Sequence, residues 1–231
     1  MHRPLVNDVQ NLIRHAAERL PLEPLENEYP VIDHNDVHIT NEMWKCPGFR
    51  KIHIEVGHTK HLEVMHCVWY PDPAYNLPIF GADIVDNGKI VTAAIVDVSP
   101  VKGVRATGIY DRLVPIANEF RFKDRRILPL WGDEIFSPIC KFVRLNTYLE
   151  KAHYWQVVEQ YLKEYVDLAL NTERDDDWVN EMLRLDDQIY YCTQQKKNTK
   201  TIAVLSQWFG REWAENYIDT ILFDEPVVPA K

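Results

Sequence analysis

The fold is decided between residues 51 and 98 by four runs, KIHIEV (51–56), LEVMHCVWY (62–70), IFGADIV (79–85) and KIVTAAIVDV (89–98). Each run changes hydropathy with a period near two and is rich in β-branched and aromatic residues, a pattern typical of strands. The junction between the last two runs contains Asn87-Gly88, a pair that tolerates positive φ in a tight turn. The stretch therefore predicts consecutive antiparallel strands, with a hairpin joining the last two.

Helices are expected on both sides of this stretch. Residues 5–20 have apolar side chains at helical spacing and end at Pro21. Residues 71–78 contain three prolines and predict a loop, and residues 134–144 predict one more strand or buried segment. The other expected helices cover residues 108–122, 147–170, 177–197 and 199–223, the last beginning at Asn198 or Thr199. This order of elements predicts an α+β fold in one domain, residues 1–231, with a central antiparallel sheet flanked by helices.

Composition excludes several classes of function. The 231 residues include 26 Lys+Arg and 35 Asp+Glu, and a net charge of −9 disfavours binding to nucleic acid. With only 8 glycines the chain shows no glycine-rich nucleotide loop, and no apolar run is long enough to cross a membrane. The four cysteines are spread singly and residues 1–8 resemble no leader peptide, so we expect reduced thiols and a cytoplasmic location.

Three titratable residues are candidates for proton transfer. Strand alternation places His53 and Glu55 on one side of their strand, and consecutive pairing would bring Glu55, His66 and Asp83 together on one sheet face. Two carboxyl groups and an imidazole in a partly desolvated pocket shift each other's pKa values and can deliver protons near neutral pH. The alternatives are a packed core histidine, a solvated glutamate and an aspartate that caps a loop.

Other chemistries have weaker support. The segment 53–67 is rich in metal-ligand types, but it lacks the spacing of a helical zinc motif, which disfavours a metal site. No nucleophile elbow occurs. Two basic clusters, at residues 121–126 and 196–200, suit an anionic small molecule or an acidic partner protein, or are simply solvated.

Several ordered blocks together resemble the ferredoxin-dependent bilin reductases. The resemblance spans residues 40–225. It is carried by FRKIHIE (49–55), MHCVWYPDP (65–73), LPIFGADIV (77–85), VSP (98–100), LPLWGD (128–133), IFS (135–137), YC (191–192), NTK (198–200), FGREWAE (209–215) and LFD (222–224).

The resemblance implies a three-layer α/β/α sandwich that holds biliverdin IXα between the sheet and the C-terminal helices. It implies a monomeric oxidoreductase without flavin, metal or nicotinamide. Reduced ferredoxin would supply electrons singly, the pocket would supply protons, and the reaction would pass through radical intermediates. By the same resemblance Glu55, His66 and Asp83 are the proton donors. The residues that it assigns to substrate binding are His53, Arg126, Asn198 and Lys200.

Three positions bear on the product that the resemblance implies. His66 is similar to the phycocyanobilin-forming branch, since phycoerythrobilin-forming relatives commonly carry Asn there, and Glu55 is the residue associated with reduction of the D-ring exovinyl group. Thr199 stands where many members carry Asp. We therefore expect four-electron reduction of biliverdin to phycocyanobilin. The alternatives are a reductase that forms phycoerythrobilin or dihydrobiliverdin, and a non-catalytic bilin carrier.

Overall fold

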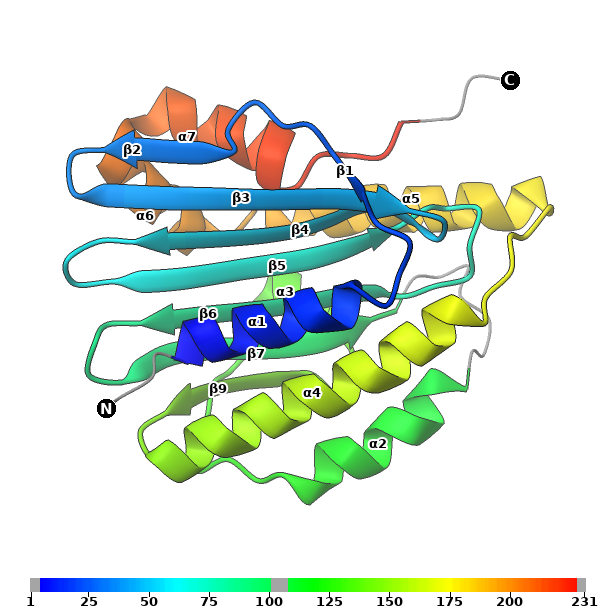
Figure 1. Cartoon of the computed structure of the whole chain (residues 1–231), viewed down its shortest axis with the longest axis horizontal. Coiled ribbons are helices and arrows are strands. Elements are labelled where there is room, and N and C mark those ends of the chain that lie inside the picture. Colours follow the sequence, from blue (N-terminus) through cyan, green and yellow to red (C-terminus); the bar gives the residue numbers. More distant parts are fainter. Residues whose placement is uncertain (1–4, 101–107, 228–231) are drawn as a thin grey trace.

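The protein is built on one antiparallel sheet with helices on both faces (Figure 1). The computed structural model describes residues 5–100 and 108–227. The expectation that residues 1–8 form no leader peptide lies partly outside these ranges. The described strands are β1 (Glu23–Pro24), β2 (Val31–His34), β3 (Val37–Cys46), β4 (Phe49–His58), β5 (Glu63–Pro71), β6 (Ile79–Asp86), β7 (Val91–Ser99), β8 (Asp124–Arg125) and β9 (Lys141–Leu145). They lie in the order β1-β3-β4-β5-β6-β7-β9-β8, and β2 pairs with β3.

The helices form two layers. They are α1 (Leu5–Ala17), α2 (Ile109–Glu119), α3 (Leu130–Asp133), α4 (Tyr148–Leu170), α5 (Trp178–Gln195), α6 (Thr199–Phe209), α7 (Arg211–Tyr217) and the π-helical turn η1 (Ile218–Leu222). In Figure 1, α1, α2 and α4 lie in front of the sheet, and α5 and α6 lie behind it. One hydrophobic core joins the sheet to α1, α2 and α4, and a second joins it to α5, α6, α7 and η1. This confirms the α/β/α sandwich.

Strand alternation separates the two cores. In β4, Ile52 and Ile54 belong to the core beneath α1 and α4, and the residues that alternate with them, His53 and Glu55, point to the face covered by the C-terminal helices. Both sets are buried, because helices cover both faces of this strand. The polar half of the strand is therefore enclosed by protein.

Two local predictions are confirmed. β6 and β7 form the expected antiparallel hairpin, in which Gly88 has φ of 80° and the Asn87 side chain accepts from the backbone N–H of Lys89 and Ile90. Asn198 caps α6, since its side chain accepts from the backbone N–H of Lys200 at 3.2 Å.

The prediction of one continuous helix over residues 199–223 is wrong. Gly210 has φ of 90°, which no right-handed helix contains, so α6 ends at Phe209 and the chain restarts as α7 and then η1. The predicted strand within 134–144 begins only at Lys141. Across the described ranges, no helix combines the length and the apolar character needed to span a membrane.

Candidate active site

A row of polar side chains crosses the sheet on the face covered by α5, α6 and α7. The strand register pairs Asn41 with Glu55, Glu55 with His66, His66 with Asp83, and Asp83 with Ile95. Residues paired directly across antiparallel strands point to the same face with Cβ atoms about 5 Å apart. The predicted convergence of Glu55, His66 and Asp83 is therefore confirmed as geometry.

His66 and Asp83 form a hydrogen-bonded pair. The Nδ1 atom of His66 lies 2.6 Å from Oδ1 of Asp83, and the two side chains are 11% and 39% exposed. Burial lowers the pKa of His66, but the charge and hydrogen bond of Asp83 and the charge of Glu55 outweigh it, so the pKa is raised. Nε2 is buried and has no hydrogen-bond partner among the described residues. It is therefore the ring atom free to face a substrate.

Glu55 is enclosed beneath α7. Its Oε2 accepts a hydrogen bond of 2.5 Å from the hydroxyl of Tyr217. Burial raises the pKa of Glu55 and the negative charge of Asp83 adds to the rise, whereas the charge of His66 and the Tyr217 hydrogen bond oppose it. The net rise favours the protonated acid, the form that can donate a proton.

His53 lies beside the row, and its hydrogen-bond partner is a neutral amide group. Its Nε2 lies 2.7 Å from Oδ1 of Asn41, and its ring centroid lies 5.9 Å from that of His66. Burial, together with the charges of Lys51 and His66, lowers the pKa of His53 well below its usual range. His53 is thus neutral, its Nε2–H is donated to Asn41, and only Nδ1, as an acceptor, is left for a further hydrogen bond.

The row becomes more exposed from β4 towards β9. Glu55 and His66 are buried, whereas Asp83, Ile95 and Phe142 are partly exposed. The guanidinium of Arg126 lies 5.0 Å from the centre of the Phe142 ring and donates to the Thr92 carbonyl at 2.7 Å. The structure thus places the predicted ligand Arg126 at the open end of the row.

The other two predicted ligands begin α6. The Lys200 side chain is exposed, and Asn198, half-buried, serves as the helix cap. Within residues 5–100 and 108–227, no hydrogen bond or ion pair joins Asn198 or Lys200 to Glu55, His66 or Asp83. The structure therefore does not bring these two residues into the row.

The end of η1 covers His66. The ring of Phe223 lies 5.4 Å from the His66 ring in an edge-to-face arrangement. Its backbone neighbours are anchored to the sheet, because the Tyr70 hydroxyl donates to the Leu222 carbonyl at 2.8 Å and Lys51 pairs with Asp224. The C-terminal helices thus close one side of the site with an aromatic ring.

A family model described as ferredoxin-dependent bilin reductase matches residues 5–224. The chain belongs to this family. It is 39% identical over 235 residues to phycocyanobilin:ferredoxin oxidoreductase of Synechococcus sp. strain CC9902, covering 98% of this chain and 95% of that protein. It is 37% identical over 234 residues to the protein of the same name from Prochlorococcus marinus strain MIT 9303, covering 96% and 87%.

The fold is also found in a solved structure. A crystal structure of tomato phytochromobilin synthase in complex with biliverdin superimposes with a TM-score of 0.81 at 16% identity, covering 93% of this chain and 81% of that one. The match confirms the predicted fold class. Family membership makes the chain an enzyme that reduces bilins with electrons from ferredoxin.

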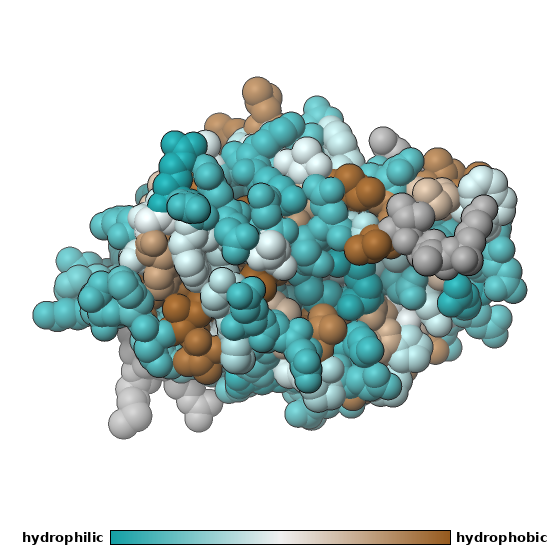
Figure 2. Space-filling model, turned by 90° about the horizontal axis from the view of Figure 1, so that it is seen from above, coloured by the Kyte–Doolittle hydropathy of each residue, from teal (hydrophilic) through white to brown (hydrophobic). Residues whose placement is uncertain are grey.

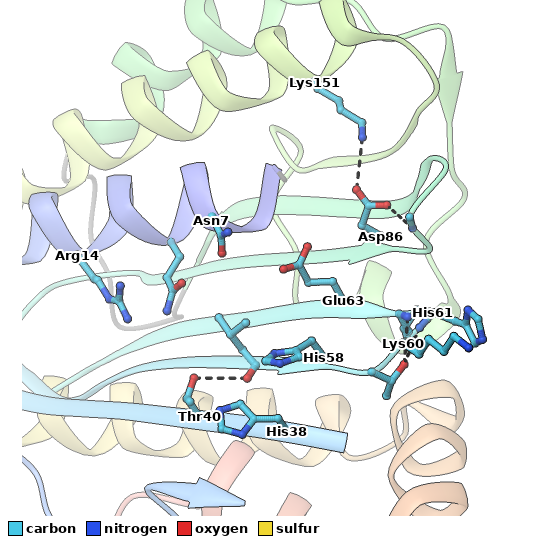
Figure 3. A pocket seen from close by; sticks show the side chains of 15 residues that line it. Asn7, Arg14, His38, Thr40, His58, Lys60, His61, Glu63, Asp86 and Lys151 are labelled. Atoms are coloured by element: carbon cyan, nitrogen blue, oxygen red, sulfur yellow. Dashed lines mark hydrogen bonds and ion pairs between the residues drawn. The ribbon is translucent and has the colours of Figure 1, made fainter. Parts of the chain in front are cut away.

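The bilin reductase also has a pocket on the opposite face of its sheet (Figure 3). It encloses about 650 Å³ between α1 and the hairpin ends, and its floor includes Asp86, paired with Lys151 at 3.3 Å. None of the predicted site residues lines it, because Val56, His58 and Glu63 alternate with the side chains of the row. The proton-transfer candidates and this pocket are therefore separate.

Sequence reasoning missed three residues that contact or surround the candidate site. Tyr217 and Asn41 complete the hydrogen bonds around Glu55, and Phe223 covers His66. Asn41 could have been predicted from the sequence, since it lies in the same alternating pattern on β3, the strand paired with β4. Tyr217 had no such signal, because its contact with Glu55 spans 162 residues.

Proposed function

We propose that the chain reduces biliverdin IXα to phycocyanobilin by four electrons taken singly from reduced ferredoxin. The observation that carries the proposal is the row of Glu55, His66 and Asp83, in which proton donors are buried at one end and open to solvent at the other. Relatives named phycocyanobilin:ferredoxin oxidoreductase, at 37–39% identity over nearly the whole chain, support the choice of product.

In this proposal His66 and Asp83 supply the proton that accompanies the first reduction. The imidazolium donates from Nε2, while Nδ1–H stays hydrogen-bonded to Asp83. Asp83 is 39% exposed and so connects the buried ring to solvent for reprotonation. Each of the two reduced double bonds gains two electrons from ferredoxin and two protons, which balances the four-electron change.

Glu55 protonates the vinyl end of the bilin in the same proposal. Its raised pKa favours the form that carries a proton, and its burial excludes competing proton donors from solvent. Glu55 and His66 lie directly opposite each other on neighbouring strands. Two donors at different depths along one row fit a conjugated substrate that is protonated at more than one atom.

We assign the substrate's carboxylates to two basic residues, Arg126 at the open end of the row and Lys200 in the first turn of α6. Arg126 can offer a bidentate contact, and Lys200 a point charge, to the two propionates. His53 and Asn198 are proposed as neutral hydrogen-bonding contacts to the substrate, in line with the lowered pKa of His53.

Anaerobic turnover of biliverdin with reduced ferredoxin, followed by absorbance and chromatography, tests the function. We expect a coloured complex on mixing and phycocyanobilin after electron delivery. A coloured complex that does not change on adding reduced ferredoxin would indicate a bilin carrier, and no absorbance shift with biliverdin would exclude a bilin-binding role. Phycoerythrobilin as the product would overturn the choice of product.

The Glu55→Gln variant tests the role of the buried acid. Glutamine keeps the size and the acceptor oxygen but has no proton to give at neutral pH, so turnover should stop at a half-reduced bilin. An unchanged product would refute the assignment of Glu55 to the vinyl group.

Three further expectations accompany this function. We propose a monomer, because the face seen from above in Figure 2 is mainly hydrophilic with hydrophobic residues in small separate groups. We propose a cytoplasmic location, since all four cysteines are free thiols. We also propose that residues 1–231 act as one domain.

A further inference from the structure

The Glu55 carboxyl stands at the end of a chain of hydrogen bonds. His53 Nε2 lies 2.7 Å from Asn41 Oδ1, Asn41 Nδ2 lies 2.7 Å from the Tyr217 hydroxyl, and that hydroxyl lies 2.5 Å from Glu55 Oε2. The four residues come from β3, β4 and α7. The chain therefore ties the sheet to the helix that covers it.

Counting donors fixes the direction of the chain. Asn41 Nδ2 also donates to the backbone carbonyl of Tyr29 at 2.8 Å, and a carbonyl only accepts, so the amide nitrogen must lie on this side. Its second hydrogen goes to the Tyr217 oxygen. Asn41 Oδ1 accepts from His53, which is neutral and protonated on Nε2.

The Tyr217 hydroxyl has one hydrogen to give. Glu55 Oε2 is its nearest acceptor, at 2.5 Å, against 3.0 Å for Asn41 Oδ1, which already accepts from His53. Oε2 of Glu55 is therefore occupied as an acceptor. When the carboxyl group is protonated, its own proton lies on Oε1.

We propose that Tyr217 is a positioning residue that confines the transferable proton of Glu55 to Oε1. The inference rests on the proposed function, in which Glu55 donates that proton to the bilin. A carboxylic acid whose proton alternates between two oxygens delivers it in two directions, whereas a fixed proton donates from one atom. Tyr217 thus helps to decide which atom of the substrate Glu55 can reach.

The packing around Tyr217 is rigid enough for this task. Its ring stacks on Trp213 with centroids 4.6 Å apart and meets Tyr29 edge to face at 5.7 Å. The residue is fully buried. Substitution by Phe would keep these ring contacts and remove only the hydroxyl, so the hydrogen bond can be tested separately from the packing.

The first test measures the titration of Glu55 in the bilin-free protein. The carboxyl C=O stretching band, assigned by its loss in Glu55→Gln, is followed by infrared spectroscopy against pH in wild type, Tyr217→Phe and a control, Tyr165→Phe. Tyr165 is also buried and donates one hydrogen bond, to the Pro78 carbonyl at 2.6 Å, but it lies in the other core.

We expect the titration of Glu55 in Tyr217→Phe to move about one pH unit higher, because a donor that favours the ionised form is lost. Tyr165→Phe should titrate as wild type. The same titration in both variants would overturn the inference. This measurement needs neither biliverdin nor ferredoxin, so it stands apart from the proposed function, which fails if wild-type protein does not reduce biliverdin.

The second test is turnover. Tyr217→Phe should build up half-reduced bilin and slow the step that uses Glu55 about tenfold, with KM for biliverdin within about twofold of wild type. Site-specific 3-fluorotyrosine at position 217, a stronger donor of the same size, should move the Glu55 titration the opposite way and keeps the inference testable if the Phe variant does not fold. A changed KM with unchanged product distribution would overturn the positioning role.

Discussion

Replacing Asp83 with Asn removes one negative charge from the His66 pair and leaves an oxygen that can still accept from Nδ1–H. The wild-type contact of 2.6 Å raises the pKa of His66 above its usual range, against burial that lowers it. In Asp83→Asn the effect of burial is no longer balanced. We therefore expect the pKa of His66 to fall, and with it the fraction of imidazolium available near neutral pH.

The exposure of the pair sets the size of this change. A hydrogen bond to a charged group contributes about 1.5–3 kcal/mol, and the lower end applies because water screens a partly exposed carboxylate. Since one pKa unit equals about 1.4 kcal/mol, His66 should titrate about one unit lower. At a pH above both values the variant holds about tenfold less imidazolium, and its first reduction should slow by a similar factor.

The assay is an NMR titration of the His66 ring in bilin-free protein, paired with anaerobic turnover. The control is Asp86→Asn, because Asp86 lies on the same strand but faces Lys151 on the opposite side of the sheet. It should leave the His66 titration unchanged. An Asp83→Asn variant with full rate and an unshifted His66 titration would refute the reasoning.

The same pair links stability to pH. Because the pKa of His66 is higher in the folded chain than the ordinary 6.5, its stabilisation is complete below about pH 6.5 and is lost as the pH rises through the folded value. Asp83→Asn should therefore destabilise the protein more at about pH 5.5 than at about pH 9, by about 1 kcal/mol in urea unfolding.

Two further predictions concern other residues. Burial raises the pKa of Asp97 from the ordinary 3.8 to about 6, although Asp97 accepts hydrogen bonds from Ser137 and Ser99. The Asp97 carboxyl group therefore stays protonated to higher pH in the folded chain than in the unfolded chain. Its contribution to stability should fall by up to about 3 kcal/mol between about pH 4 and pH 6, and urea unfolding of Asp97→Asn should lack that fall. Arg126→Ala should weaken biliverdin binding about tenfold in an absorbance titration with little change in kcat, whereas the exposed Arg211→Ala should bind as wild type; equal affinities would exclude Arg126 as a ligand.

The sheet and the centre of the site were predictable from the sequence because both depend on local pattern. Alternation gave Glu55, His66 and Asp83 their common face, and consecutive pairing gave their register. Short turns leave little freedom in how neighbouring strands meet, as the Asn87-Gly88 hairpin illustrates.

The contacts made by the C-terminal helices were not predictable in this way. Helical spacing identifies residues 199–223 as apolar on one side, but it does not show that Gly210 breaks the helix at φ of 90°. That break redirects α7, and α7 carries Tyr217 to Glu55. Long-range docking of a helix on a sheet depends on side-chain fit across the whole surface, which no short motif encodes.

The two faces of β4 show why its pattern points to chemistry rather than to packing. Ile52 and Ile54 fill one core, while His53 and Glu55, equally buried, face the other. Burying polar side chains costs free energy unless partners satisfy them, and apolar residues of similar volume are often no less stable there. Here Tyr217 and Asn41 supply the partners for Glu55 and His53, but His66 Nε2 and His53 Nδ1 remain unsatisfied among the described residues. Unpaired nitrogens in an otherwise completed network, on a row that opens towards solvent, are best explained by a ligand that supplies the missing hydrogen bonds.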